Sequence, residues 1–141
     1  MRPIPLVLCA LLLTGCSSFQ ADPEDVRQVP SDRLLAFQQP VPQGSRIVVT
    51  RDLGMLGGGC YITVLVDRQP AARLGIGEQA SFAVAAGERI LGIGADTLDD
   101  SWCGKGSLRR ERLVRSAAGA TYHYRVVSES VSGFGLREEV R

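Results

Sequence analysis

The sequence predicts an all-β domain: a small antiparallel sandwich or partly open barrel of about seven or eight short strands, preceded by one short helix. Two observations lead to this fold class. From Ser45 onward, short β-branched or alternating apolar runs are separated by turns rich in Gly and Asp. These runs do not alternate with helical patterns, which argues against a parallel α/β sheet.

The first fifteen residues have the three parts of a secretory signal. Arg2 supplies a cation, residues 4–13 form an apolar stretch, and the small residues Thr14 and Gly15 follow. The apolar stretch is about half of the roughly 20 residues that a membrane-spanning helix needs. We therefore expect residues 1–15 to be removed as a signal peptide.

The signal ends in Leu13-Thr14-Gly15-Cys16, which resembles the lipobox of bacterial lipoproteins. This resemblance implies a lipid on the Cys16 sulfur, cleavage just before Cys16, and anchoring by acyl chains, of which two suffice for stable attachment. In such lipoproteins an Asp after the cysteine favours the inner membrane, whereas this chain has Ser17. An outer-membrane anchor with the domain in the periplasm is therefore expected. The alternative is an ordinary signal peptide that happens to end at a cysteine.

Residues 16–44 are polar and rich in proline, so they are predicted to form a lipidated tether that carries the short helix. Pro30 or Ser31 can begin this helix, and Pro40 ends it. Its apolar face would consist of Leu34, Leu35 and Phe37. The helix either covers one end of the domain or binds a partner. Residues 45–141 then form the β domain.

Eight strands are expected in the β domain, at residues 46–51, 60–67, 72–76, 80–86, 89–94, 108–115, 121–128 and 134–140. The segments 86–88 and 117–120 contain glycine and are predicted to be hairpin turns. The predicted core consists of Val48, Ile62, Val64, Val66, Phe82, Val84, Leu91, Ile93 and Val126.

Part of this strand order resembles a known type of domain. The segments Val64-Leu65-Val66-Asp67, Leu74-Gly75-Ile76-Gly77-Glu78 and Phe82-Ala83-Val84-Ala85-Ala86-Gly87-Glu88 are similar to small surface-attached β domains of the DUF2846 and PEGA type. In those domains glycine follows the Asp, where this chain has Arg68, and proline precedes the later glycine, where it has Ala86. The resemblance covers residues 60–95. It implies a sandwich that binds or braces something at the cell envelope, without catalytic residues.

Four cysteines have three expected roles. Cys9 lies in the discarded signal and Cys16 takes the lipid, which leaves Cys60 and Cys103 in the domain. In an oxidising periplasm this pair is expected to form a disulfide between the start of the second strand and the loop 96–106. A metal pair or a reactive thiol is the alternative, but a metal site needs further ligands and His123 is the only histidine.

The charge of the chain gives no reason to expect nucleic acid as a partner. The whole sequence has 16 Lys and Arg against 15 Asp and Glu, and removing residues 1–15 takes away one of the arginines. The mature chain is then formally neutral. Its basic cluster consists of Arg109, Arg110, Arg112 and Arg115. Strand alternation splits these arginines between two faces, as expected for a protected edge strand or for a site that binds anionic glycans or lipid phosphates.

Motifs for catalysis are not found. His123 is predicted to point away from Tyr122 and Tyr124 on its strand, and no nucleophile accompanies it in the sequence. The acidic segment with Asp96, Asp99 and Asp100 fits a solvated loop better than a calcium site. We therefore predict no catalytic residue, no metal and no cofactor.

The expected function is that of a non-enzymatic, lipid-anchored envelope protein whose domain has a binding or structural role. Its partner would be another envelope protein or the cell-wall polymer, in addition to the membrane that the acyl chains on Cys16 enter. Candidate partner-binding residues are Trp102, Arg109, Arg110 and Arg112. The alternative is a periplasmic inhibitor or soluble-ligand-binding lipoprotein, which would present the loop 96–106 with Trp102.

Overall fold

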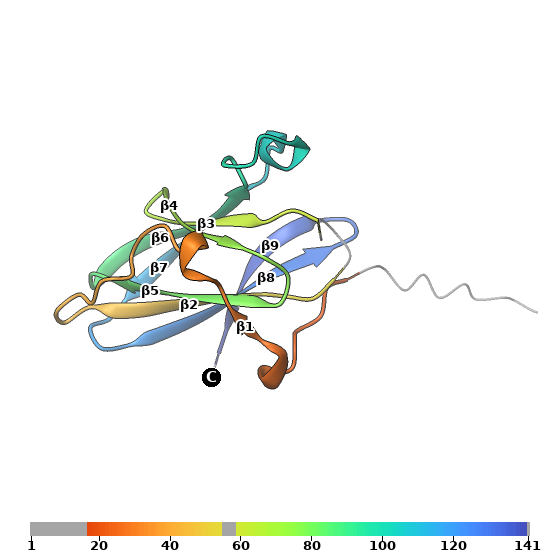
Figure 1. Cartoon of the computed structure of the whole chain (residues 1–141). Helices are drawn as coiled ribbons and strands as arrows, with labels where there is room; N and C mark the ends of the chain where they lie inside the picture. Colours follow the sequence, from red (N-terminus) through yellow and green to blue (C-terminus); the bar gives the residue numbers. More distant parts are fainter. Residues whose placement is uncertain (1–16, 55–58, 141) are drawn as a thin grey trace, which may run out of the picture.

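Two β-sheets face each other in the computed structural model, which describes residues 17–54 and 59–140 (Figure 1). One sheet has the strand order β1-β5-β2-β8-β9 and the other the order β4-β3-β6-β7. The all-β prediction is confirmed, and the two separate sheets form a sandwich, not a closed barrel.

The strands are β1 (Arg27–Gln28), β2 (Ser45–Arg51), β3 (Ile62–Val66), β4 (Gln69–Leu74), β5 (Glu78–Val84), β6 (Gly87–Ala95), β7 (Arg109–Ser116), β8 (Thr121–Glu129) and β9 (Gly133–Glu139). The helical segments are the 3-10 turns η1 (Pro23–Asp25), η2 (Ser31–Arg33) and η3 (Trp102–Lys105). Within residues 17–54 and 59–140, no helix has the length and hydropathy needed to cross a membrane.

The core lies between the two sheets and is made of side chains that alternate along the strands. Eight of the nine predicted core residues belong to it. Val48 is buried but does not belong to this core cluster. Its neighbours Ile47 and Val49 belong to it and are fully buried. The run Ile47-Val48-Val49 is apolar throughout, so alternation alone could not tell which face points inward.

The larger sheet is mixed, which corrects the prediction of a purely antiparallel sandwich. β2 pairs in parallel with β8, and β1 pairs in parallel with β5. Parallel neighbours need a long connection, and the chain between β2 and β8 builds the whole second sheet. The predicted hairpins at 86–88 and 117–120 are also wrong, because each of these turns joins strands of different sheets.

The hairpin between β3 and β4 turns at Asp67 and Arg68, whose φ angles are 48° and 64°. Two successive left-handed residues are typical of the tight turn that matches strand twist, and glycine usually fills the second position. Here Asp67 holds the turn, because its Oδ1 accepts the Ile90 backbone N–H at 2.9 Å and its Oδ2 pairs with Arg89 at 3.0 Å. Arg68 therefore has the backbone conformation that the expected glycine would have.

The predicted N-terminal helix is not formed. A single 3-10 turn, η2, is followed by extended backbone at Leu34, which forms a β-bridge with Ala72 of β4. The backbone N–H groups of Leu35 and Ala36 donate to the Ala71 carbonyl at 2.9 and 3.3 Å, so they are not available for helical bonds. Hydrogen bonding to the edge of β4 therefore replaces the helix that the local sequence favours.

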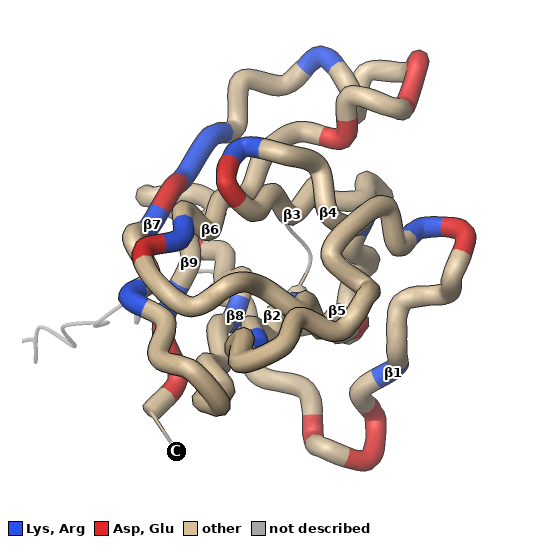
Figure 2. Tube along the Cα trace, turned by 90° about the vertical axis from the view of Figure 1, so that its left-hand side faces the viewer, with Lys and Arg blue, Asp and Glu red and all other residues tan. Residues whose placement is uncertain are grey.

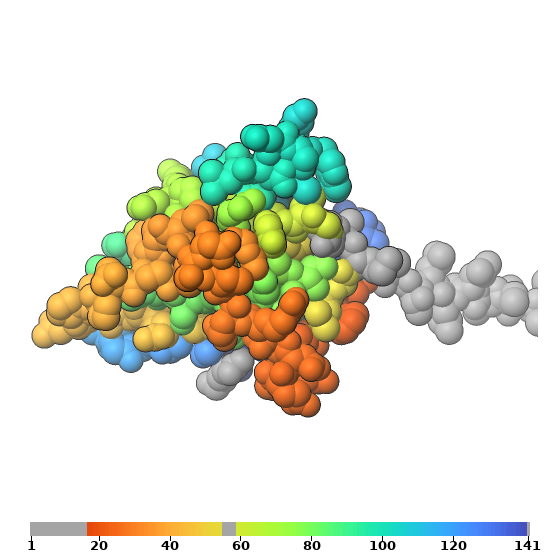
Figure 3. Space-filling model, viewed as in Figure 1, coloured from red at the N-terminus to blue at the C-terminus, as the bar shows by residue number. Residues whose placement is uncertain are grey.

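Residues 17–44 lie against the domain over most of their length, in contrast to the expected tether (Figure 3). β1 adds a short strand to the sheet, and Val29 is buried in the core. Leu34 and Phe37 pack against the core as well, as expected for a segment that covers one end of the domain. The N-terminal segment is thus part of the folded unit.

Candidate functional site

The outer face of the smaller sheet contains a groove of about 420 Å³. Leu65 of β3 and Ile90 of β6 supply apolar walls, and the end of the projecting loop 96–108 borders the groove, with the Leu108 side chain packed against the core. Pro70 of β4 and Ser107 complete the sides. The core side chains of the same strands point the other way, so the groove is separated from the core by the sheet itself.

Two glycines at alternate positions of β6 form the floor of this groove. Gly92 pairs with Leu65 on one side and Glu111 on the other, and Gly94 pairs with Thr63 and Arg109. A Cβ at Gly94 would meet its nearest atoms at 3.5 Å, which is ordinary contact. The groove therefore exists because two side chains are missing, and a larger residue at Gly94 could fill it without a backbone clash, whereas a Cβ at Gly92 would lie only 3.3 Å from the Arg110 carbonyl oxygen.

Charged side chains stand at the rim of the groove. Glu111 pairs with Arg68 at 3.3 Å and with Arg109 at 3.0 Å. The pKa of Glu111 is lowered mainly by the hydrogen bond from Arg68, and next by the hydrogen bond from Arg109. Figure 2 shows the basic stretch along β7 with an acidic residue inside it. Two guanidinium groups around one carboxylate leave the rim with a net positive charge.

The lining of the groove combines apolar side chains with charged ones. Its charged lining residues are the guanidinium groups of Arg68 and Arg109 and the Glu111 carboxyl, whose pKa these two partners lower. His123 lies on β8 of the other sheet, on the strand face opposite Tyr124, which is buried in the core. Among the described residues, no three His, Cys, Asp or Glu side chains are grouped as metal ligands.

The predicted partner-binding arginines lie on an edge strand, β7, but they do not form one site. Arg109 lines the groove on the outer face. Arg112 lies on the other face and donates to the Leu136 carbonyl of β9 at 3.3 Å. Arg110 donates to the Arg109 carbonyl at 3.0 Å. Strand alternation thus divides the cluster as the sequence predicts.

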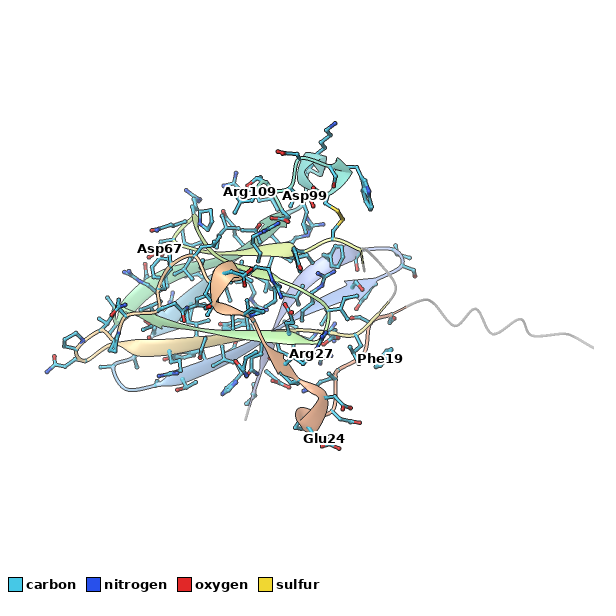
Figure 4. The ribbon with its side chains drawn as sticks, viewed as in Figure 1. Phe19, Glu24, Arg27, Asp67, Asp99 and Arg109 are labelled. Atoms are coloured by element: carbon cyan, nitrogen blue, oxygen red, sulfur yellow. A yellow bond between two sulfur atoms is a disulfide. The ribbon has the colours of Figure 1, made fainter. Side chains whose placement is uncertain are left out.

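The predicted disulfide joins Cys60 to Cys103, with 5.5 Å between the two Cα atoms. It fastens a loop that projects from the sandwich (Figure 4). This loop carries Trp102, which is 73% exposed. Within this loop the Ser101 N–H donates to Asp99 at 2.6 Å. Cys16, the predicted lipidation site, lies outside the described residues.

Asp96 differs from the solvated loop residue that the sequence predicts. It is completely buried and forms a two-point ion pair with Arg73, at 2.6 and 2.8 Å. The ring of Tyr61 lies under the guanidinium groups of both Arg73 and Arg33, at 5.1 and 4.3 Å. Arg73 is paired with Asp96, and Arg33 is paired with Glu78. These ion pairs fasten the loop and the N-terminal segment to the domain.

Sequence reasoning missed the floor and walls of the groove, including Leu65, Ile90, Gly92 and Gly94. The alternation of glycine in Gly92-Ile93-Gly94 was a usable signal, because glycine inside a strand often marks a close approach by another group. No family model matches the chain, and comparison with curated proteins and with solved structures finds no match.

Proposed function

We propose that this protein is a non-enzymatic, lipid-anchored envelope protein whose β domain binds a peptide segment of an envelope or cell-wall partner. Cys16 would carry the lipid, in the outer membrane, and the domain would face the periplasm. The glycine-floored groove with its positive rim is the observation that carries this proposal. Its lining offers apolar contact and charge, as ligand-binding grooves commonly do.

The chemistry of the groove favours one kind of occupant. Its volume of about 420 Å³ suits a few residues of extended chain, and Leu65 and Ile90 suit an aliphatic side chain. Arg68 and Arg109 together exceed the charge of Glu111 and suit a carboxylate. The occupant we propose is therefore an extended peptide that carries an aliphatic side chain next to a carboxylate.

Gly94→Leu should block the groove and reduce partner capture on the order of tenfold or more. The new side chain would enter the groove, while its Cβ makes only 3.5 Å contacts, so the fold should persist. Capture is measured in intact cells by photo-cross-linking from position 90. Arg109→Gln, which makes the rim formally neutral, should weaken capture less.

Gly135→Leu is the matched control, because it places the same side chain on β9 of the other sheet, where a Cβ would lie 3.8 Å from Val127. Its cross-linked products should equal those of the unchanged protein. If Gly94→Leu also leaves the products unchanged, the groove is not the binding site.

An inhibitor or soluble-ligand-binding lipoprotein is the second candidate, and the projecting loop with exposed Trp102 is the observation that favours it. In that case the loop, held by the disulfide, would insert into its target.

Trp102→Ala separates the two candidates. Because Trp102 is 73% exposed, its replacement should change the free energy of unfolding by no more than about 0.5 kcal/mol. If the groove is the binding site, peptide capture should be unchanged. Urea unfolding measures the stability of the variant, and the same cross-linking measures its capture. Loss of capture with unchanged stability would favour the loop over the groove.

A further inference from the structure

The chain is fastened to the domain immediately after the proposed lipidation site. The Ser18 N–H donates to the Ser128 carbonyl at 2.8 Å, and the Ser128 N–H donates to Ser18 Oγ at 2.8 Å. Ser18 Oγ in turn donates to Asp52 at 2.9 Å. Phe19 and Leu53 exchange two backbone hydrogen bonds of 2.9 Å. Residue 18 is thus held by the ends of β2 and β8.

This attachment limits how far the domain can move from the membrane. Cys16 precedes Ser18 by two residues, and an extended chain spans at most about 3.6 Å per residue. A lipid on Cys16 would therefore begin within roughly 7 Å of the Ser18 backbone, plus the length of its own side chain. The bilayer surface would then lie directly against this end of the domain.

Four segments come together at this end of the sandwich. They are residues 52–54 after β2, the β4–β5 turn, the β8–β9 turn and the start of the loop 96–108. β2 and β8 run in parallel and finish here, so the β8–β9 turn lies beside residues 52–54 (Figure 1). Arg51 joins the two sheets, because its Nη1 donates to the carbonyls of Cys60 and Leu74 at 2.7 and 2.9 Å. Ile62 pairs with Ala95, which brings the start of the loop 96–108 to the same end.

The segments that meet at this end carry four large exposed apolar side chains, alongside exposed polar and charged residues such as Glu129 and Asp100. The set, which we call the apolar end, consists of Phe19, Leu98, Trp102 and Val131. Each of them is at least 61% exposed. At the opposite end, the loop before β2 contributes Val41 at 37%, and the arches 85–86 and 117–120 carry small residues. Of the other strongly exposed apolar residues, Leu113 lies on β7 and Val140 follows β9.

We propose that the apolar end rests on the bilayer surface and is a membrane-contact site. This inference depends on the lipid anchor of the proposed function. Large exposed apolar side chains next to a lipidated residue would enter the interfacial region, where tryptophan is favoured. Asp99 and Asp100 outweigh Lys105 in the projecting loop, so contact does not depend on anionic lipids.

This placement orients the groove as well. The groove lies on the flank of the sandwich, along β3, β6 and β7, and the membrane would lie at the end where β6 finishes. The groove thus opens sideways, parallel to the bilayer. Its occupant would be bound within about one domain length of the membrane, instead of at the end of a long tether.

Tryptophan fluorescence in reconstituted protein tests the contact. The mature lipidated protein is placed in phosphatidylcholine vesicles with or without lipids brominated near the headgroup end of their acyl chains. Trp102 is the only tryptophan and should lose intensity to the bromine and shift to shorter wavelength. In a Trp102→Phe background, Val131→Trp should behave in the same way.

Val41→Trp in the same background is the matched control and should show neither change, because it lies at the opposite end. Circular dichroism confirms that each variant is folded, which is expected because Val131 is 98% exposed. Flotation with vesicles separates the two proposals. Protein that floats while Trp102 and Val131→Trp stay unquenched overturns the contact alone, and protein that does not float overturns the anchor and the contact together.

Discussion

Replacing Cys60 with Ser should lower the free energy of unfolding by about 4 kcal/mol under oxidising conditions. The disulfide closes a loop with a sequence separation of 43 residues, and opening it returns conformational entropy to the unfolded chain. The figure is an upper value, since any strain released in the folded state reduces the loss. Urea unfolding of a Cys16→Ser chain, which carries no lipid, measures the change.

Three further measurements isolate the disulfide as the cause. Cys103→Ser and the double variant should be destabilised by the same amount as Cys60→Ser, because the bond is lost once in each. Reductant should bring the parent chain to the same midpoint and should not affect the variants. A double variant markedly less stable than either single variant would mean that the cysteines stabilise the domain in ways other than their bond.

The strand pattern of this chain was largely visible in its sequence, but the pairing was not. Alternation in segments such as 60–67 and 121–128 marks half-buried strands, whichever sheet they join. It cannot show that Arg46–Arg51 lies parallel to a segment some 75 residues later, because that pairing depends on contacts between distant parts of the chain. β1 has only two residues and no periodicity to detect.

The helix at Ser31 was mispredicted for a related reason. Its start, apolar face and stop were all present locally, yet the edge of β4 offered the Leu35 and Ala36 N–H groups a carbonyl partner. The same limit applies to the groove. Arg109 was identified from composition, but its position beside Gly94 depends on the register of β6 and β7. Only the glycine alternation was a local signal for the floor.

The ion pair between Arg33 and Glu78 could not be anticipated, because 45 residues separate its members. Two hydrogen bonds of 2.6 and 2.7 Å join the side chains, which are 11% and 8% exposed. Arg33 also donates to the Arg73 carbonyl at 3.0 Å, and Glu78 accepts the Gly75 N–H at 2.7 Å. This pair fastens the N-terminal segment to the start of β5.

Arg33→Ala should destabilise the domain by about 3–5 kcal/mol at pH 7, because it leaves the Glu78 carboxylate buried without its partner. Urea unfolding measures the loss. The double variant Arg33→Met with Glu78→Met should recover most of it, since apolar side chains of similar size need no partner. A single variant that costs less than about 1 kcal/mol would contradict the assignment of this pair as a buried bond.

The loss caused by Arg33→Ala should also depend on pH. Burial raises the pKa of Glu78, but the hydrogen bonds from Arg33 and Gly75 and the Arg33 charge outweigh it, so this pKa is lowered. The pair therefore stabilises the fold fully above the unfolded pKa of about 4.3, and this stabilisation is lost as the pH falls toward the folded pKa. Without Arg33, burial instead favours the protonated carboxyl. The difference between parent and variant should thus shrink from pH 7 to pH 3, and a constant difference would mean that Glu78 does not titrate against Arg33.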